Sequence, residues 1–151
     1  MFSLNLPTFN HKITKIEGDL YIFDMLRKKH LKLTPEEWVR QHFINYLIFY
    51  LGYPKNLIRS EASLKFNNLS KRADIIVYAA DLLHPLIVVE CKAPFVPLTD
   101  EVWKQASAYA HTLQPRYVCI TNGMEHFYVK TGAELEKING LPAAKDIFKK
   151  D

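Results

Sequence analysis

Two apolar runs carry charged side chains at positions where a buried strand is normally apolar. The first run, 73–78, contains Asp74, and the second, 86–92, contains Glu90 and Lys92. Glu90 and Lys92 are two residues apart, which places them on one face of a strand, about 6–7 Å from each other. Burying charges is costly unless they pair or bind a metal ion. The runs therefore indicate either a site that uses these charges or a structural ion network that closes a pair of strands.

The pattern around these runs predicts a single domain, and 48% hydrophobic content over 151 residues suits one packed core. Thr34, Pro35 and Glu37 form a capping-box helix start. We expect this helix to reach Leu51, with an inward apolar stripe that includes Tyr46 and Tyr50. The expected elements of the core are a helix over 34–51, strands over 57–65, 73–80 and 86–93, a helix over 100–113, and strands over 116–121 and 125–130.

The expected core, 34–131, follows a β-rich N-terminal extension over 1–33 and precedes a C-terminal tail over 132–151. We expect a turn over 67–70 and a short helix around 142–150. If a hairpin joins the two charged runs, Asp74 lies across from the Glu90–Lys92 region. A shared metal site requires Asp74 and Glu90 to face the same side of the sheet.

The bulk properties exclude several classes of function. The chain has neither a GxxxxGK[ST] phosphate loop nor a GxGxxG motif, so we expect no nucleotide cofactor. It has no apolar run long enough for a membrane span and no basic start typical of a signal peptide, so we expect a soluble, cytoplasmic protein. The two cysteines, Cys91 and Cys119, lie in apolar runs and fit buried reduced thiols. The net charge of +4 is compatible with a polyanionic partner.

The charged runs have the chemistry of a phosphodiester hydrolase. Asp74 and Glu90 offer the carboxylate oxygens that Mg²⁺ prefers, and the backbone carbonyl of Cys91 offers another oxygen. Lys92 could hold an attacking water or stabilise charge that develops on phosphorus. The structural alternative, an Asp–Lys–Glu network between strands, stays open at this point because perturbed charges mark sites only probabilistically.

Two helices contribute further candidates. Gln105 and Tyr109 are four residues apart and share one helix face, where they could meet DNA or a metal-bound water. Taken alone, a glutamine that binds loop backbone and a tyrosine in the core explain this pair more simply. Glu37 and Arg40 are three residues apart, and, taken alone, a capping box with a surface ion pair is the favoured explanation for them as well.

Taken in order, these motifs resemble the type I restriction enzyme R protein N-terminal domain family, in the QxxxY branch of the PD-(D/E)xK nuclease superfamily. Asp74 and Glu90-Cys-Lys92 resemble the PD-(D/E)xK motif, although Ala73 stands where proline is usual, and Gln105-x-x-x-Tyr109 resembles QxxxY. Further matching segments are Ile22-Phe-Asp-x-x-Arg27, Leu33-Thr-Pro-Glu-Glu-x-Val-Arg-Gln41, Gly52-Tyr-Pro54, Ala73-Asp-Ile-Ile-Val-Tyr78, Val89-Glu-Cys-Lys-Ala-Pro94 and Thr121-Asn-Gly123.

The resemblance implies an α/β (α+β) restriction-endonuclease-like fold, with a mixed central sheet flanked by helices. It implies that Asp74 and Glu90 bind Mg²⁺, for which Mn²⁺ could substitute, and that Lys92 is catalytic. It assigns a supporting or DNA-contacting role to Gln105 and Tyr109. Glu37 best matches the first-helix carboxylate of the family site, with Glu36 as the substitute candidate.

The implied activity is a Mg²⁺-dependent DNA endonuclease without the helicase motor of full R subunits. The implied partners are DNA and subunits of a restriction system, and a homodimer would supply the two sites that a double-strand break needs. The alternative is a nuclease-fold module that binds DNA or a restriction-system protein and does not cut. A third reading is a plain structural domain with a buried ion network.

Overall fold

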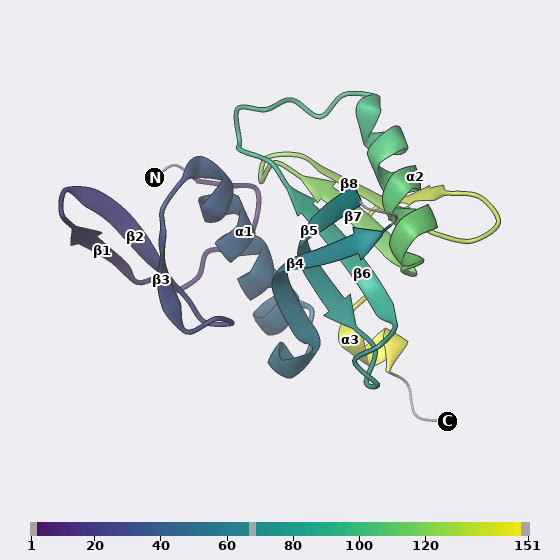
Figure 1. Cartoon of the computed structure of the whole chain (residues 1–151), viewed down its shortest axis with the longest axis horizontal. Coiled ribbons are helices and arrows are strands. Elements are labelled where there is room, and N and C mark those ends of the chain that lie inside the picture. Colours follow the sequence, from purple (N-terminus) through teal and green to yellow (C-terminus); the bar gives the residue numbers. More distant parts are fainter. Residues whose placement is uncertain (1–2, 67–68, 149–151) are drawn as a thin grey trace.

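The computed structural model describes the backbone of residues 3–66 and 69–148, and the side chains of these residues outside 61–72. A small antiparallel sheet, in the order β1-β2-β3, occupies the N-terminal part of the chain. Its strands are β1 (Ile13–Ile16), β2 (Asp19–Asp24) and β3 (Lys29–Lys32). This arrangement confirms strands in the expected β-rich extension, and Figure 1 shows the small sheet on the opposite side of the first helix from the rest of the protein.

A larger mixed sheet, in the order β4-β5-β6-β7-β8-β9, forms the centre of the molecule. Its strands are β4 (Ile58–Phe66), β5 (Leu69–Tyr78), β6 (Pro85–Cys91), β7 (Tyr117–Thr121), β8 (His126–Lys130) and β9 (Glu136–Ile138). The β6–β7 pair is parallel, because α2 (Glu101–Leu113) crosses over between them, and the other neighbours are antiparallel. The mixed, helix-flanked sheet confirms the expected fold class.

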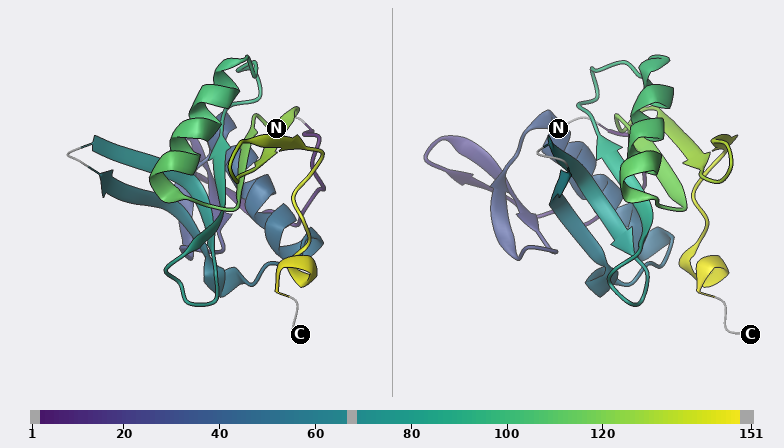
Figure 2. Two further views of the ribbon diagram at one scale, coloured as in Figure 1. Left: turned by 90° about the vertical axis from the view of Figure 1, so that its right-hand side faces the viewer. Right: turned by 45° about the vertical axis from the view of Figure 1, so that its right-hand side comes forward.

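Helices cover both faces of this sheet, as Figure 2 shows from the side. On one face, Val39 and Phe43 of α1 (Pro35–Asn45) pack against Ile75 and Val89. On the other face, residues of α2 such as Ala106 pack against strand residues that alternate with the first set. This alternation follows from the two-residue period of a strand, and it explains why the central runs are apolar almost throughout.

The first helix changes its winding before it ends. After Asn45 the chain continues as a π-helix over Tyr46–Tyr50, in which the Leu51 N–H donates to the Tyr46 carbonyl at 3.0 Å. This i→i+5 spacing rotates the last turn relative to an α-helix. The expectation that Tyr50 faces the core is therefore wrong, since its side chain is 70% exposed.

The C-terminal region adds to the sheet. β9 pairs with β8 at the edge, a strand that the sequence pattern did not predict, and α3 (Ala144–Ile147) is the short helix expected around 142–150. Of the turn expected over 67–70, residues 67–68 lie outside the described part of the chain. Within that described part, the helices are all too short or too polar to cross a membrane.

Candidate active site

The hairpin of β5 and β6 brings the charged runs together. Ile75 pairs with Val89, so Asp74 lies across from Glu90, within the expected Glu90–Lys92 region. The Cys91 N–H donates to Asp74 Oδ2 at 2.7 Å, which fixes the carboxylate at the end of β6. Asp74, Glu90 and Lys92 line one pocket of about 370 Å³. The remaining lining residues are Glu36, Cys91, Ala93 and Val96.

The two carboxylate oxygens of Glu90 have different surroundings. Tyr109 donates its hydroxyl proton to Glu90 Oε1 at 2.8 Å, and burial raises the pKa of the Tyr109 phenol, which keeps it a donor. Glu90 Oε2 lies 3.3 Å from Lys92 Nζ, yet this oxygen is buried and accepts no hydrogen bond. Lys92 is thus a charge partner of this oxygen, but no hydrogen bond satisfies it, which is rare for a buried polar atom.

A buried ion network holds Asp74 from the other side. Arg40 donates to Asp74 Oδ1 at 3.0 Å and to Glu37 Oε1 at 2.6 Å, and it also lies 3.3 Å from Glu36 Oε1. Gln41 donates to Glu37 Oε2 at 2.9 Å. Arg40 and Glu37 are each only 6% exposed, so this is a core network and not the surface ion pair that spacing alone favoured.

The electrostatics of the pocket favour binding a cation. Burial raises the pKa of Asp74 above its ordinary range, while the Cys91 N–H and Arg40 oppose that rise. Burial also raises the pKa of Glu36, and the neighbouring Asp74 charge adds to the increase. Carboxylates whose pKa is raised in this way gain stability when a positive ion binds between them.

The structure separates the two first-helix carboxylates that the sequence left as alternatives. Glu36 lines the pocket, whereas Glu37 uses both oxygens to bind Arg40 and Gln41 away from it. Gln105 does not line the pocket, and its Oε1 is buried without a hydrogen-bond partner. Cys91 is a buried free thiol, as expected, and burial raises the pKa of this thiol well above its ordinary value.

Some contributors to the site were missed from the sequence. Val96 lines the pocket from the loop after β6, and Asn122 holds that loop by donating to the Val96 carbonyl at 2.8 Å. Gly123 follows with a φ of +87°, where an added Cβ would lie 3.0 Å from Leu4. The Thr121-Asn-Gly123 segment therefore has a positional role, which an asparagine–glycine pair signals only as a turn.

The donor set fits a magnesium ion. Asp74 accepts one hydrogen bond at each oxygen, which leaves about half of the roughly four lone-pair sites of a carboxylate. Glu90 Oε2 has no hydrogen-bond partner at all. Among the described side chains, no group of three or more His, Cys, Asp and Glu residues is close enough to hold a metal. A metal ion here would have to be held by Asp74 and Glu90 with few protein ligands, and Mg²⁺ is the ion that accepts one or two carboxylates with water or phosphate oxygens to complete its shell.

A family model for the type I restriction enzyme R protein N terminus (HSDR_N) matches residues 35–143 of this chain. The chain belongs to this family. The matched region contains every residue that lines the pocket and the Arg40 network beside it. Among curated protein sequences, none matches the chain significantly.

Two solved structures resemble the chain. One is a fragment described as a candidate HsdR subunit of a type I restriction enzyme from Vibrio vulnificus YJ016, with a TM-score of 0.59 and 23% identity over 78% of this chain and 25% of that chain. The other is described as a candidate nuclease of the DUF820 group from Anabaena variabilis ATCC 29413, with a TM-score of 0.45 and 17% identity over 89% of this chain and 80% of that chain. The first likeness shows a shared fold, and this chain spans about a quarter of that fragment.

Proposed function

We propose that this chain is a Mg²⁺-dependent DNA endonuclease domain that hydrolyses phosphodiester bonds. The observation that carries the proposal is the buried, hydrogen-bond-free Oε2 atom of Glu90, which lies beside Lys92 in a pocket that Asp74 also lines. Asp74 and Glu90, with the Cys91 carbonyl, would hold the metal ion, and Mn²⁺ would substitute for it. When bound, such an ion polarises a phosphoryl oxygen.

The protein side chains would orient the reactants. The Lys92 ammonium group is placed to hold the attacking water or to stabilise negative charge on the phosphate oxygens. Glu36 has a raised pKa and lines the same pocket, so it is suited to accept a proton from the water. Tyr109 and Arg40 do not reach the pocket lining themselves, and they position Glu90 and Asp74 through hydrogen bonds.

The family indicates the setting of this activity. Because the chain belongs to the restriction R protein family, we infer that subunits of a restriction system direct it to DNA in the cytoplasm. A double-strand break needs two cleavage sites, which a homodimer would provide.

A second candidate function is a module that binds DNA or a restriction-system partner without cutting. The feature in its favour is the Arg40 guanidinium, which already pairs with Asp74 Oδ1 and supplies the positive charge that a metal would otherwise bring. In this reading the pocket is electrostatically complete without an ion, and Lys92 contacts a phosphate without promoting its hydrolysis.

A plasmid-nicking assay with Mn²⁺ distinguishes these functions. We expect the wild type to nick supercoiled DNA and Lys92→Ala to lose at least about tenfold of that activity, in line with typical losses for a removed electrostatic group. Lys137→Ala, which changes an exposed lysine on the opposite edge of the sheet, is the matched control and should nick like the wild type.

Metal binding is measured separately by thermal unfolding. Mg²⁺ or Mn²⁺ should raise the melting temperature of the wild type and leave Asp74→Asn unchanged. Metal-dependent stabilisation with equal background nicking in wild type and Lys92→Ala would rule out the nuclease and support the binding module. If neither ion stabilises the wild type and nothing is nicked, the metal site itself is refuted.

A further inference from the structure

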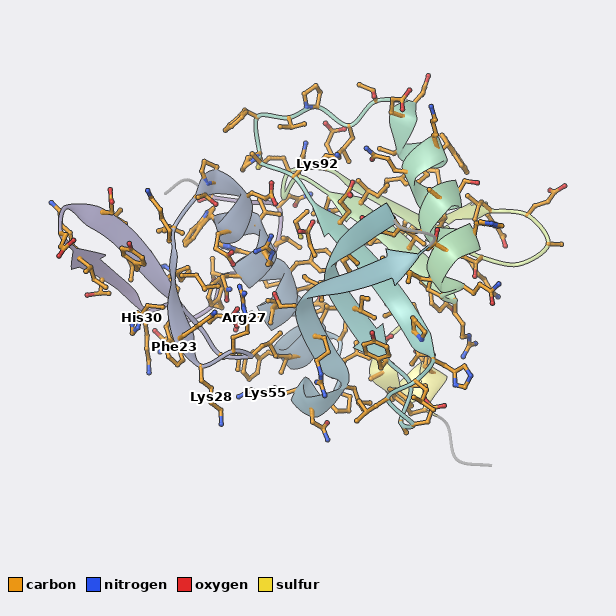
Figure 3. All side chains as sticks on the ribbon, viewed as in Figure 1. Phe23, Arg27, Lys28, His30, Lys55 and Lys92 are labelled. Carbon is orange, nitrogen blue, oxygen red and sulfur yellow. The ribbon has the colours of Figure 1, made fainter. Side chains whose placement is uncertain are left out.

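Two basic segments far apart in the sequence meet on the side of the molecule where the small sheet joins the edge of the large one. Arg27 and Lys28 lie in the turn between β2 and β3, Lys55 lies in the 3₁₀ turn before β4, and Arg59 lies at the start of β4. Figure 3 shows Lys28 and Lys55 next to each other, well separated from Lys92. Together these residues line a pocket of about 580 Å³. The polar residues that line it are Arg27, Lys28, Lys55, Asn56, Arg59 and Ser60.

The turn that carries Arg27 and Lys28 is rigidly held. Asp24 is fully buried and accepts hydrogen bonds from the backbone N–H groups of Leu26 at 2.8 Å and Arg27 at 3.3 Å. Its other oxygen accepts from Arg27 Nε at 3.1 Å. Lys28 then takes a left-handed φ of 54°, which ends the turn with its side chain exposed. The turn backbone is thus fixed, with Arg27 held by its ion pair to Asp24 and the exposed Lys28 side chain carried at the rim of the pocket.

The opposite wall is also preorganised. Lys55 begins a short 3₁₀ turn, Lys55–Leu57, and Arg59 donates through its Nη1 atom to the carbonyls of Asn56 at 2.8 Å and Ile58 at 3.1 Å. Ser60 Oγ is buried and has no hydrogen-bond partner. Among the described side chains, none of those lining this pocket is acidic. Converging cations and an unpartnered hydroxyl form an environment that suits a phosphate oxyanion.

The basic pocket lies one strand away from the candidate active site. Arg59 pairs with Ile76 across β4 and β5, and Asp74 is two residues further along β5. Strand geometry therefore puts the Cα atoms of Arg59 and Asp74 about 8 Å apart. The cationic groups of the two places are further apart than these Cα atoms, as Figure 3 shows for Lys28, Lys55 and Lys92, so a duplex would present a different backbone phosphate to each.

We propose that the pocket formed by Arg27, Lys28, Lys55 and Arg59 binds a backbone phosphate of the duplex DNA that the candidate active site would cut, at a distance from the cleaved bond. The nature of the ligand rests on the proposed function, whereas the preference for a phosphate rests on the pocket itself. The pocket positions the duplex and takes no part in the chemistry. Its contribution to binding is independent of base sequence, as is typical of phosphate contacts.

The test is the salt dependence of binding to a fluorescent 20-base-pair duplex, measured by anisotropy in EDTA so that no cleavage occurs. The variant is Lys28→Gln/Lys55→Gln, and the control with the same charge change is Lys130→Gln/Lys137→Gln, both exposed residues of β8 and β9. Losing this one phosphate contact should lower the slope of log K against log salt by about one and weaken binding roughly tenfold at 0.1 M salt. The control should keep the wild-type slope.

The remaining outcomes are decisive. Equal weakening in both double variants, with melting temperatures unchanged, would reduce the effect to net charge and overturn the proposal. Displacement of the duplex by millimolar inorganic phosphate at constant ionic strength would assign the pocket to a free phosphate, and displacement by polyglutamate would assign it to an acidic protein.

The nicking assay keeps this inference distinguishable from the proposed function. Pocket-dependent binding of DNA without any nicking would refute the nuclease and leave the phosphate site standing. Metal-dependent nicking by the wild type, together with an unchanged salt slope in Lys28→Gln/Lys55→Gln, would refute the phosphate site alone.

Discussion

Glu37 and Glu90 lie on either side of Asp74, and their surroundings differ in one decisive respect. Both oxygens of Glu37 accept hydrogen bonds, from Arg40 and Gln41, inside the packed core. Glu90 has one oxygen bound by Tyr109 and one buried oxygen with no hydrogen bond. A buried charge that is fully satisfied contributes to structure, whereas one left unsatisfied is a candidate for ligand binding.

Asp74 belongs to both regions. Its Oδ1 atom joins the Arg40 network, and its carboxylate lines the pocket with Glu90 and Lys92. The network therefore holds one metal-ligand candidate in place, and its integrity is a condition for the pocket. The difference between the two regions is best tested by variants that break one region and leave the other intact.

The largest effect is expected from Arg40→Met. This change leaves Glu37 and Asp74 as buried or half-buried carboxylates without their cation, and losing one partner of a buried pair costs about 3–5 kcal/mol. Urea unfolding followed by circular dichroism measures the free energy of unfolding. Arg116→Met, at an exposed arginine, is the matched control and should stay within about 0.5 kcal/mol of the wild type. A similarly small change for Arg40→Met would show that the network contributes little to stability.

An intermediate effect is expected from variants of the adjacent carboxylates Glu36 and Glu37. One variant should change stability and the other should change nicking. Glu37→Gln removes a buried partner of Arg40 and should cost about 1–3 kcal/mol of unfolding free energy. Glu36→Gln changes a side chain that is 49% exposed, so its stability should stay within about 0.5 kcal/mol of the wild type. Metal-dependent nicking should instead fall in Glu36→Gln.

Stability and nicking are to be measured on both glutamine variants. If Glu36→Gln nicked at the wild-type rate, Glu36 would not be the first-helix carboxylate of the site. A nicking defect confined to Glu37→Gln, at temperatures where that variant is folded, would return the role to Glu37.

The sequence predicted much of this arrangement because the relevant signals are local. The charged positions in the runs of β5 and β6 and the hairpin between them place Asp74 beside Glu90, within the region that the hairpin predicted. The Tyr109–Glu90 hydrogen bond and the choice between Glu36 and Glu37 could not be predicted. Both depend on how helices pack on the sheet, and residues 36 and 37 differ by only about 100° around a helix of 3.6 residues per turn.

The basic pocket likewise depends on a contact that the sequence does not predict. Each basic segment taken alone is most simply a solvated surface, and the sequence contains no sign that 27–28 and 55–59 meet. The π-helical turn at Tyr46–Tyr50 was also hidden, because its residues follow the apolar pattern of an ordinary helix. Local sequence patterns do not predict contacts between distant segments. Both proposed sites depend on such contacts.

The smallest effect concerns the pH dependence of metal binding and compares the carboxylates of the pocket with Glu37 of the network. The pKa of Asp74 is raised above the ordinary 3.8 and that of Glu36 above the ordinary 4.5, in both cases first by burial. Without metal, the folded state therefore binds more protons than the unfolded state near these values, so these groups lower the unfolding free energy as the pH rises through that range. Metal binding needs the deprotonated forms and should reverse this trend.

The increase in melting temperature caused by Mn²⁺ should thus be largest near neutral pH and should decline on acidification at a pH above the ordinary pKa of aspartate. Glu36→Gln removes one carboxylate whose proton competes with the metal ion. The pH at which the Mn²⁺ effect declines should therefore fall by a fraction of a pH unit, because the other carboxylates remain. Glu37→Gln should leave the midpoint unchanged, because Glu37 binds Arg40 and Gln41 outside the pocket. A Mn²⁺ effect independent of pH between 4 and 7 would show that the ion binds elsewhere, and the distinction between the network and the pocket would then rest on the stability measurements alone.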